Sequence, residues 1–189
     1  MSLTQASTSA GSQVTTAGEG RPVLVLGAGF AGSAAFERLA RRFRVHAMAP
    51  DGDASGWIAS QGFEKLGIVG LGAAAGHALA AARAAGEIVD ALVLVSPVGL
   101  PLGDADGPMK PLLKDVVAAK CVLIGDRDPG ARDLAAYKTE LSRSHVVLVF
   151  DAGVDVANDR PEAFASAAGD FLDRQGRFNF ITESVAIST

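Results

Sequence analysis

The stretch that decides the fold is PVLVLGAGFAGSAAFERLAR, residues 22–41. It opens with a short run of apolar residues, Pro22–Leu26, which predicts a strand buried on both faces. The glycine-rich turn Gly27–Gly32 follows, and a helix is predicted around Ser33–Arg41. A strand that passes through a tight turn into a helix is half of a βαβ unit, so we expect the strand to join a parallel sheet.

The alternation of strands and helices continues along the chain. Because it contains no hairpin-type turns, the expected fold class is α/β, with a doubly wound, mostly parallel sheet in a three-layer sandwich. Ligands of such sheets bind at the carboxyl ends of the strands. The further expected strands are 44–49, 67–71, 91–96, 121–124 and 145–150. The further expected helices are 73–85, 110–119 and 132–142. A last helix is expected to start at Asp159-Arg160-Pro161, with Asp159 as its candidate cap, and to run to about Arg174.

The length of 189 residues fits a single domain with a sizeable core. Residues 1–20 are rich in Ser, Thr, Gly, Gln and Ala, so we expect a flexible N-terminal arm, in which a short strand is expected within 13–16. The folded domain is expected over 21–176, and a C-terminal strand or tail over 177–189.

Charge and composition exclude several kinds of partner. The net charge of −4 gives no general attraction to nucleic acid or to an anionic membrane. The one basic run, Arg38, Arg41, Arg42 and Arg44, is interpreted as a solvated helix face. A lone Cys121 within an apolar run excludes an internal disulfide and is expected in the core. The chain shows no secretion signal and no apolar stretch of membrane-spanning length, so the expected compartment is the cytoplasm.

The glycine turn allows a second interpretation. Gly27, Gly29 and Gly32 match G-x-G-x-x-G between a strand and a helix, the arrangement that binds the pyrophosphate of NAD(P) or FAD. Asp51 lies about where the ribose-binding acid is expected, but it stands between a proline and a glycine and not at the end of a strand. A Rossmann domain is therefore kept as an alternative, and we expect no cofactor.

Several segments, in the right order, resemble the α/β-hydrolase family, from about Val14 to the carboxyl end. The resemblance implies an α/β-hydrolase-like fold. The short connections after Asp51 and Pro101 imply that it lacks a lid domain. The segments are AGEGRPVLVL (17–26), AGFAGSAAFERLARRFRVHAMAPD (28–51), VGLGAAAGHALAAARAAGEIV (69–89), VDALVLVSPVGLP (89–101), CVLIGDRDP (121–129) and DAGVDVANDRPEAFASAAGDFL (151–172).

The same resemblance indicates that the catalytic residues are missing. A serine hydrolase needs a serine on a sharp turn, a histidine that takes its proton and an acid that orients the histidine. The family's serine position falls at Gly72 and its histidine position at Val154, and only the acid is retained, as Asp128. Losing the serine or the histidine lowers turnover on the order of 10⁶-fold. Asp155 could pair with Asp128 as a second carboxylate, but no nucleophile or cofactor accompanies them.

The resemblance also places a vestigial oxyanion wall at Ala28, Gly29, Phe30 and Ala73. Ala28 occupies the position of the family's His-Gly loop histidine. The backbone N–H groups of Phe30 and Ala73 would be the remaining donors, which any residue type supplies.

Other residues that could replace the lost groups are expected to be structural. Histidines within predicted strands and helices are interpreted as packed or capping residues, and the two serines as strand-end or helix-start residues. His, Cys and acidic residues with metal-ligand spacing are absent, so no metal is expected. The residues considered are His46, His77, His145, Ser33 and Ser96.

These observations favour a non-catalytic α/β-hydrolase-like protein, a structural or regulatory subunit of a homo- or hetero-oligomeric complex. The alternative is an esterase-type enzyme of the same fold with relocated catalytic residues. The tail that begins at Phe178 is apolar and β-prone, and its only charged residue is Glu183. We expect it at the contact between subunits, because an exposed strand edge is usually paired or covered. The other interpretation is that it folds back on its own sheet.

Overall fold

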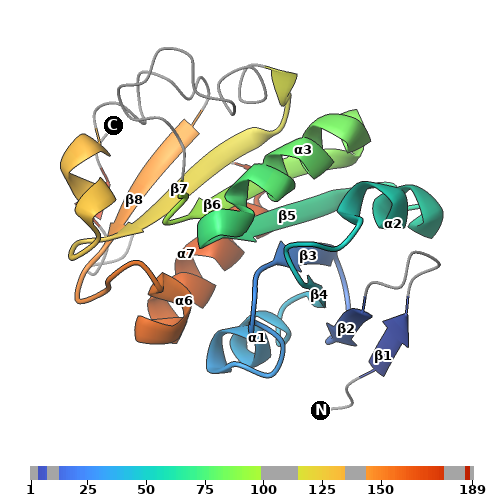
Figure 1. The fold of residues 1–189 in the computed structure, drawn as a ribbon, viewed down its shortest axis with the longest axis horizontal. Helices are drawn as coiled ribbons and strands as arrows, with labels where there is room; N and C mark the ends of the chain where they lie inside the picture. Colours follow the sequence, from blue (N-terminus) through green and yellow to red (C-terminus); the bar gives the residue numbers. More distant parts are fainter. Residues whose placement is uncertain (1–3, 8–12, 99–114, 135–143, 177–185, 188–189) are drawn as a thin grey trace.

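A computed structural model describes residues 4–7, 13–98, 115–134, 144–176 and 186–187 of the chain. Its strands form one sheet in the order β1-β2-β4-β3-β5-β6-β7-β8-β9 (Figure 1). The strands are β1 (Thr4–Ser7), β2 (Gln13–Ala17), β3 (Pro22–Leu26), β4 (Arg44–Met48), β5 (Leu66–Leu71), β6 (Val89–Val95), β7 (Ala119–Gly125), β8 (Ser144–Val149) and β9 (Ala186–Ile187).

The central strands, in the order β4-β3-β5-β6-β7-β8, pair in parallel. Antiparallel strands flank them on both sides. The parallel register is regular: Leu24 of β3 lies beside His46 of β4 on one side and Ile68 of β5 on the other. β2 pairs antiparallel with β4, and β1 with β2, at one edge, and β9 pairs antiparallel with β8 at the other. The expected doubly wound, mostly parallel sheet is confirmed.

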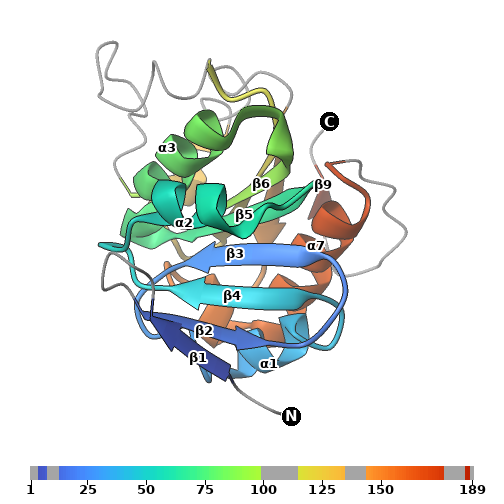
Figure 2. The ribbon, with the colours of Figure 1, turned by 90° about the vertical axis from the view of Figure 1, so that its right-hand side faces the viewer.

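Helices cover both faces of the sheet (Figures 1 and 2). Side chains alternate along β3: Val23 and Val25 lie in one buried cluster, and Leu24 and Leu26 in the other. The expected three-layer sandwich is therefore confirmed, and the described residues contain no lid domain. The first cluster includes residues of α1 (Ala34–Leu39), α6 (Val156–Asp159) and α7 (Pro161–Asp173), and the second includes residues of α2 (Ala54–Gln61) and α3 (Ala75–Ala85).

Several helix predictions need correction. The helix expected over 110–119 does not reach its end, because Val116–Ala118 are not helical and β7 begins at Ala119; residues 110–114 lie outside the described part of the chain. The helix expected over 132–142 is described only at its start, where Pro129–Asp133 form a 3₁₀ turn, η3. Asp159 is not the cap of α7: it ends α6, and Arg160 holds the cap position.

The N-terminal arm is also shorter than expected. The strand predicted within 13–16 is confirmed as β2, and its residues Val14–Ala17 pair with β4. Val14 is 1% exposed and Ala17 is buried with it, so burial of apolar surface fixes this segment to the domain. The expectation of a flexible arm up to residue 20 is therefore wrong for Gln13–Ala17.

The described part of the tail pairs with its own chain. Ala186 and Ile187 form β9, with Ile187 opposite Val147 and Ala186 opposite Leu148 of β8. At these two residues the tail folds back on its own sheet, as the second interpretation expected. The apolar residues of 178–185 lie outside the described part of the chain.

The basic run, which begins at Arg38 in α1 and ends at Arg44, is solvated and also forms ion pairs. The Arg42 guanidinium donates to Asp170 at 2.9 Å and to Asp173 at 2.8 Å, and Arg38 donates to Glu162. These pairs join the end of α1 to α7. No helix in the described ranges is long and apolar enough to cross a membrane.

Candidate functional site at the carboxyl edge of the sheet

A sharp turn joins β5 to α3 through the 3₁₀ turn η1 (Gly72–Ala74). Gly72 has a φ of +55°, a left-handed value that disfavours side chains, and a Cβ added there would meet no atom within 4 Å. Gly70 is needed for a different reason: a Cβ added there would lie 2.6 Å from the Cβ of Ala78 in α3. The helix therefore packs directly on the strand, and Gly72 forms a left-handed turn at the position of the family's serine.

The turn opens into a pocket of about 230 Å³ at the carboxyl ends of the parallel strands. Gly72, Ala73, Ala28, Phe30 and Val154 all line it, so most of the residues that the sequence predicted as a site lie together. The other lining residues are Pro50, Leu71, Ala74, Val95, Asp155, Val156, Ala157 and Asn158.

Two predicted residues lie away from this lining. Gly29 is exposed and has a left-handed φ of +68°, and an added Cβ would meet nothing within 4 Å. Asp128 follows β7 and caps η3, where its Oδ1 accepts a hydrogen bond of 2.8 Å from the N–H of Gly130. The acid position is therefore on the neighbouring loop and has a local structural partner.

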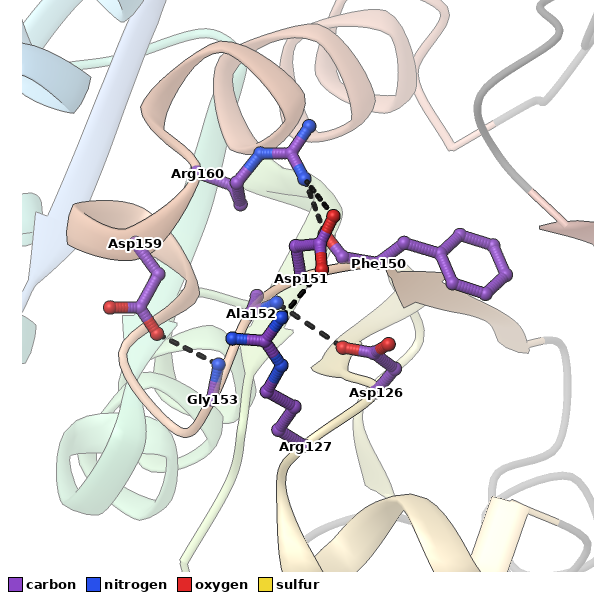
Figure 3. A network of polar contacts seen from close by, with 8 residues as sticks. All are labelled: Asp126, Arg127, Phe150, Asp151, Ala152, Gly153, Asp159 and Arg160. Carbon is purple, nitrogen blue, oxygen red and sulfur yellow. Dashed lines mark hydrogen bonds and ion pairs between the residues drawn. The ribbon is translucent and has the colours of Figure 1, made fainter.

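The loops after β7 and β8 are joined by hydrogen bonds (Figure 3). The N–H of Arg127 donates to the carbonyl of Ala152 at 2.9 Å, and the N–H of Ala152 donates to Oδ1 of Asp126 at 3.2 Å. The Arg127 guanidinium also lies 2.5 Å from Oδ1 of Asp151. These contacts hold the loops that carry Asp128 and Val154 side by side.

The far side of the β8 loop is held by the start of the last helix (Figure 3). Oδ2 of Asp159 accepts a hydrogen bond of 2.7 Å from the N–H of Gly153, next to Val154. Arg160 donates to the carbonyl of Phe150 at 2.7 Å. Contacts on both sides thus fix the backbone that presents Val154 to the pocket.

Asp155, which was considered only as a partner of Asp128, and Asn158, which was not predicted, both line the pocket and form one unit. Asp155 caps α6: Oδ1 accepts from the N–H of Asn158 at 3.4 Å, and Oδ2 accepts from its side-chain amide at 2.8 Å. Aspartate is a favoured N-cap residue, so Asp155 could have indicated the start of this short helix. In the described ranges, no hydrogen bond joins Asp155 to Asp128.

Phe30 and Ala73, whose N–H groups the resemblance implies as oxyanion donors, have no described backbone partner for those N–H groups. The ring of Phe30 packs edge-on against Phe36 and Phe164, with centroids 5.9 and 6.0 Å apart, which fixes the position of its backbone. Its N–H donates to no other described residue, and the N–H of Ala73, at the start of a helical turn, has no partner within that turn. Both residues line the pocket.

His46 is a packed histidine. It is 7% exposed, its Nδ1 lies 2.9 Å from Oγ1 of Thr16, and its ring lies 5.0 Å from that of Trp57 and 5.7 Å from that of Phe63. Burial, with a smaller contribution from the charge of Arg44, lowers its pKa to about 4. The interpretation of His46 as a structural residue is confirmed.

The remaining candidates also lie outside the lining. His145 packs edge-on against Phe171, and burial lowers its pKa. His77 is exposed on α3. Ser33 caps α1, where its hydroxyl accepts from the N–H of Phe36, as expected for a helix start. Cys121 is fully buried, which raises the pKa of its thiol, so its assignment to the core is confirmed.

Ser96 is less ordinary than the sequence suggested. It follows β6 with a left-handed φ of +41°, is 5% exposed, and its hydroxyl has no partner among the residues described. Its N–H donates to the carbonyl of Leu123 at 2.8 Å, and its neighbour Val95 lines the pocket. A strained, buried polar residue at a strand end is a common feature of functional sites.

The strand order differs from that of a dinucleotide-binding domain. A Rossmann half places three successive strands in the order 3-2-1, whereas here β4 and β5 lie on opposite sides of β3. Asp51 lies exposed in a turn after β4. The described residues also contain no group of three or more His, Cys, Asp or Glu that could hold a metal ion.

Known proteins resemble this chain in structure. No protein-family model and no curated protein matches it. A solved α/β hydrolase from a sediment metagenome of the lagoon of Mar Chica, Morocco, matches with a TM-score of 0.70 at 18% identity, covering 92% of this chain and 99% of the other. The fold is that of the α/β-hydrolases.

Two other solved structures with this kind of fold are similar. A serine hydrolase involved in carbazole degradation has a TM-score of 0.75 at 19% identity, covering 92% of this chain and all (100%) of the other. An E-2-(acetamidomethylene)succinate hydrolase has a TM-score of 0.74 at 17% identity, covering 91% of this chain and 100% of the other. At these identities the likeness concerns the α/β-hydrolase fold.

Proposed function

We propose that this protein is a non-catalytic member of the α/β-hydrolase fold that acts as a structural or regulatory subunit of an oligomeric complex. One observation carries the proposal. Among the described residues that line the pocket, none has a hydroxyl, a thiol or an imidazole, although the lining includes both Gly72 and Val154.

The chemistry of the lining supports this proposal. Acyl transfer needs a nucleophile and a base within hydrogen-bond reach of each other. Asp155 is the one ionisable side chain among the described lining residues, and Asn158 occupies both of its oxygens. The N–H groups of Phe30 and Ala73 could still hold a carbonyl oxygen, but no described lining residue carries a nucleophile that could attack its carbon.

A partner is supported by apolar side chains left on the same edge. Val98 is 61% exposed, Val154 is 59% exposed and Phe150 is 47% exposed. Val98 is tied to the turn, because its N–H donates to the carbonyl of Gly72 at 3.2 Å. Exposed apolar residues that form one patch mark association sites, and these three residues share one edge of the sheet.

The test combines activity and mass. Purified full-length protein should neither hydrolyse p-nitrophenyl acetate above the buffer rate nor be labelled by a fluorophosphonate. Light scattering after size exclusion should give a multiple of the chain mass, or the mass of a complex when the protein is isolated from its native source. Stoichiometric labelling that one serine substitution abolishes would refute the non-catalytic role, and a monomer that recovers no partner would refute the subunit role.

Ser96 supports a second candidate, an esterase-type enzyme with a relocated nucleophile. Its left-handed backbone resembles that of Gly72 in the turn one strand away, and its hydroxyl is unpartnered within the described residues. The same labelling experiment separates the two candidates: the enzyme requires labelling that Ser96→Ala removes and Ser33→Ala leaves intact.

A further inference from the structure

The pocket at Gly72 has the size and polarity to bind one bulky apolar side chain. Its walls include Phe30, Leu71, Val95 and Val156, and its volume of about 230 Å³ exceeds the roughly 150 Å³ that is enough to hold a benzene molecule in an apolar cavity. Its volume is therefore large enough for a phenyl ring.

The apolar surface continues outside the pocket. Val154 lines it and is 59% exposed, and Val98, beside the Gly72 turn, is 61% exposed. A small molecule confined to the pocket would leave Val98 in water. A partner that continues beyond the pocket would cover it, so the surface suits a side chain carried on a polypeptide.

The charges are unbalanced on the loop that lines the pocket and on the loop hydrogen-bonded to it. The loops 126–128 and 150–160 carry five aspartates and two arginines. Both arginines lie beside Asp151, Arg127 at 2.5 Å and Arg160 at 3.5 Å.

The other four aspartates accept hydrogen bonds only from backbone or amide N–H groups within the described ranges, and no cationic side chain there pairs with them. Because they are not neutralised, they favour a cationic partner and disfavour a carboxylate ligand. Asp155, in the lining itself, would repel such a carboxylate at close range. The four are Asp126, Asp128, Asp155 and Asp159.

We propose that this edge of the sheet binds a basic segment of a partner protein, with one phenylalanine-sized side chain of that segment in the pocket at Gly72. The inference rests on the proposed function and specifies the chemistry of the partner. The buried apolar side chain supplies most of the binding energy. The four aspartates named above, called the acidic rim here, select the charge of the flanking residues.

The probe is the peptide acetyl-Lys-Lys-Phe-Lys-Lys-amide, titrated into isotope-labelled full-length protein and followed by the amide NMR shifts of Ala73, Val154 and Asn158. The same peptide with serine in place of phenylalanine should bind about tenfold or more weakly, because it buries no apolar side chain. The peptide with glutamates in place of the lysines should not bind. Affinity for the basic peptide should fall as salt is raised.

Two double variants with equal charge changes test the position of the acidic rim. Asp128→Asn with Asp155→Asn keeps at each position the Oδ1 that accepts from a backbone N–H, although the Asn158 amide loses its acceptor Oδ2, and should weaken the basic peptide about fivefold. Glu64→Gln with Glu87→Gln removes two exposed charges that precede β5 and β6, at the opposite edge, and should change the affinity less than twofold. Ala73→Leu, at an exposed lining position, should abolish the preference for phenylalanine over serine.

The outcomes are distinct. Equal affinity for the phenylalanine and serine peptides, equal effects of the two double variants, or no binding of the basic peptide overturns this inference. The proposed function fails separately, if the protein hydrolyses p-nitrophenyl acetate or if mass spectrometry finds the bound peptide cleaved. Peptide binding without hydrolysis or cleavage supports both.

Discussion

Oγ1 of Thr16 and Nδ1 of His46 lie 2.9 Å apart, and this contact links the N-terminal β2 to the first crossover strand, β4. The other ring nitrogen of His46, Nε2, is buried and has no partner in the described part of the chain. Uncharged rings, those of Trp57 and Phe63, pack against the same imidazole. The site therefore accommodates a neutral histidine and opposes a charged one.

We predict that the free energy of unfolding decreases as the pH is lowered, because of His46. Its pKa lies at about 4 in the folded protein, below its usual 6.5, so the unfolded chain binds the proton more tightly. The contribution is complete above pH 6.5, declines as pH falls and levels off below pH 4, with a loss of at most about 3 kcal/mol. Urea unfolding at a series of pH values should show this decline.

The matched controls for this prediction are His46→Gln and His145→Gln. The first should remove most of the decline between pH 6.5 and 4, because glutamine does not titrate. The second should retain most of it, since His145 is only partly buried. If both variants follow the pH profile of the original protein, carboxylates and not His46 cause the decline.

The two glycines of the turn should differ in their response to alanine. At Gly72 the cost is conformational only, about 1 kcal/mol, because an added Cβ has free space. At Gly70 the added Cβ would press on Ala78 and displace α3, so we expect about 2–3 kcal/mol. Denaturant unfolding measures both values. Equal costs would mean that α3 does not pack on β5 as described.

We predict that the pocket can be made catalytic. Gly72→Ser places a hydroxyl on the left-handed turn, where a Cβ meets nothing, and Val154→His restores the imidazole on the rigidly held loop. The double variant should hydrolyse p-nitrophenyl acetate about a hundredfold faster than Gly72→Ser alone, the usual contribution of a general base. Adding Asp128→Asn should remove most of the gain. A double variant no faster than either single variant would place these positions out of mutual reach.

The ion pair of Arg21 and Asp90 should contribute more to the free energy of unfolding than the ion pairs on the surface do. Arg21 precedes β3 and its guanidinium reaches across Gly67 of β5 to Asp90 in β6, with the two side chains only 18% and 14% exposed. Arg21→Met should cost about 3 kcal/mol, because it leaves a buried carboxylate unpaired, and adding Asp90→Leu should recover most of it.

The comparison for this prediction is Arg38→Met, which removes the exposed pair with Glu162. Its glutamate is 62% exposed, so the cost should stay within about 1 kcal/mol. Thermal or urea unfolding of the four proteins decides the matter. Similar costs for Arg21→Met and Arg38→Met would show that burial adds nothing to the first pair.

The central strands could be predicted because each is a continuous apolar run. Such a strand is apolar on both faces and is therefore buried between two layers of helices. α2 was not predicted, although its buried residues Ala54, Trp57 and Ile58 have the i, i+3, i+4 spacing of a helix. Three apolar positions in eight residues, with Gly56 among them, are too short a pattern to stand out. Its ends carried the available signal: Asp53 caps it through the N–H of Gly56, and Gly62 ends it with a φ of +68°.

The site divides in the same way. Gly72 and Val154 were placed by their order within resembling segments, and the fold brings both to one pocket. The prediction of Asp159 as a helix cap was wrong. Its carboxylate accepts a hydrogen bond from the N–H of Gly153 across the loop and does not cap the helix that follows. The left-handed backbone of Ser96 contradicts the extended conformation that its following proline favours, so only tertiary packing explains it.

The position of Trp57 gives this protein a built-in optical probe. It is the only tryptophan in the chain, it is 8% exposed, and the imidazole of His46 lies against it. Its emission therefore reports on one place, the junction of α2, β4 and the N-terminal strands. Release of β2 from the sheet edge would admit water to the indole and shift its emission to longer wavelength, so the rates at which this edge opens and closes can be timed in stopped-flow experiments without any attached dye.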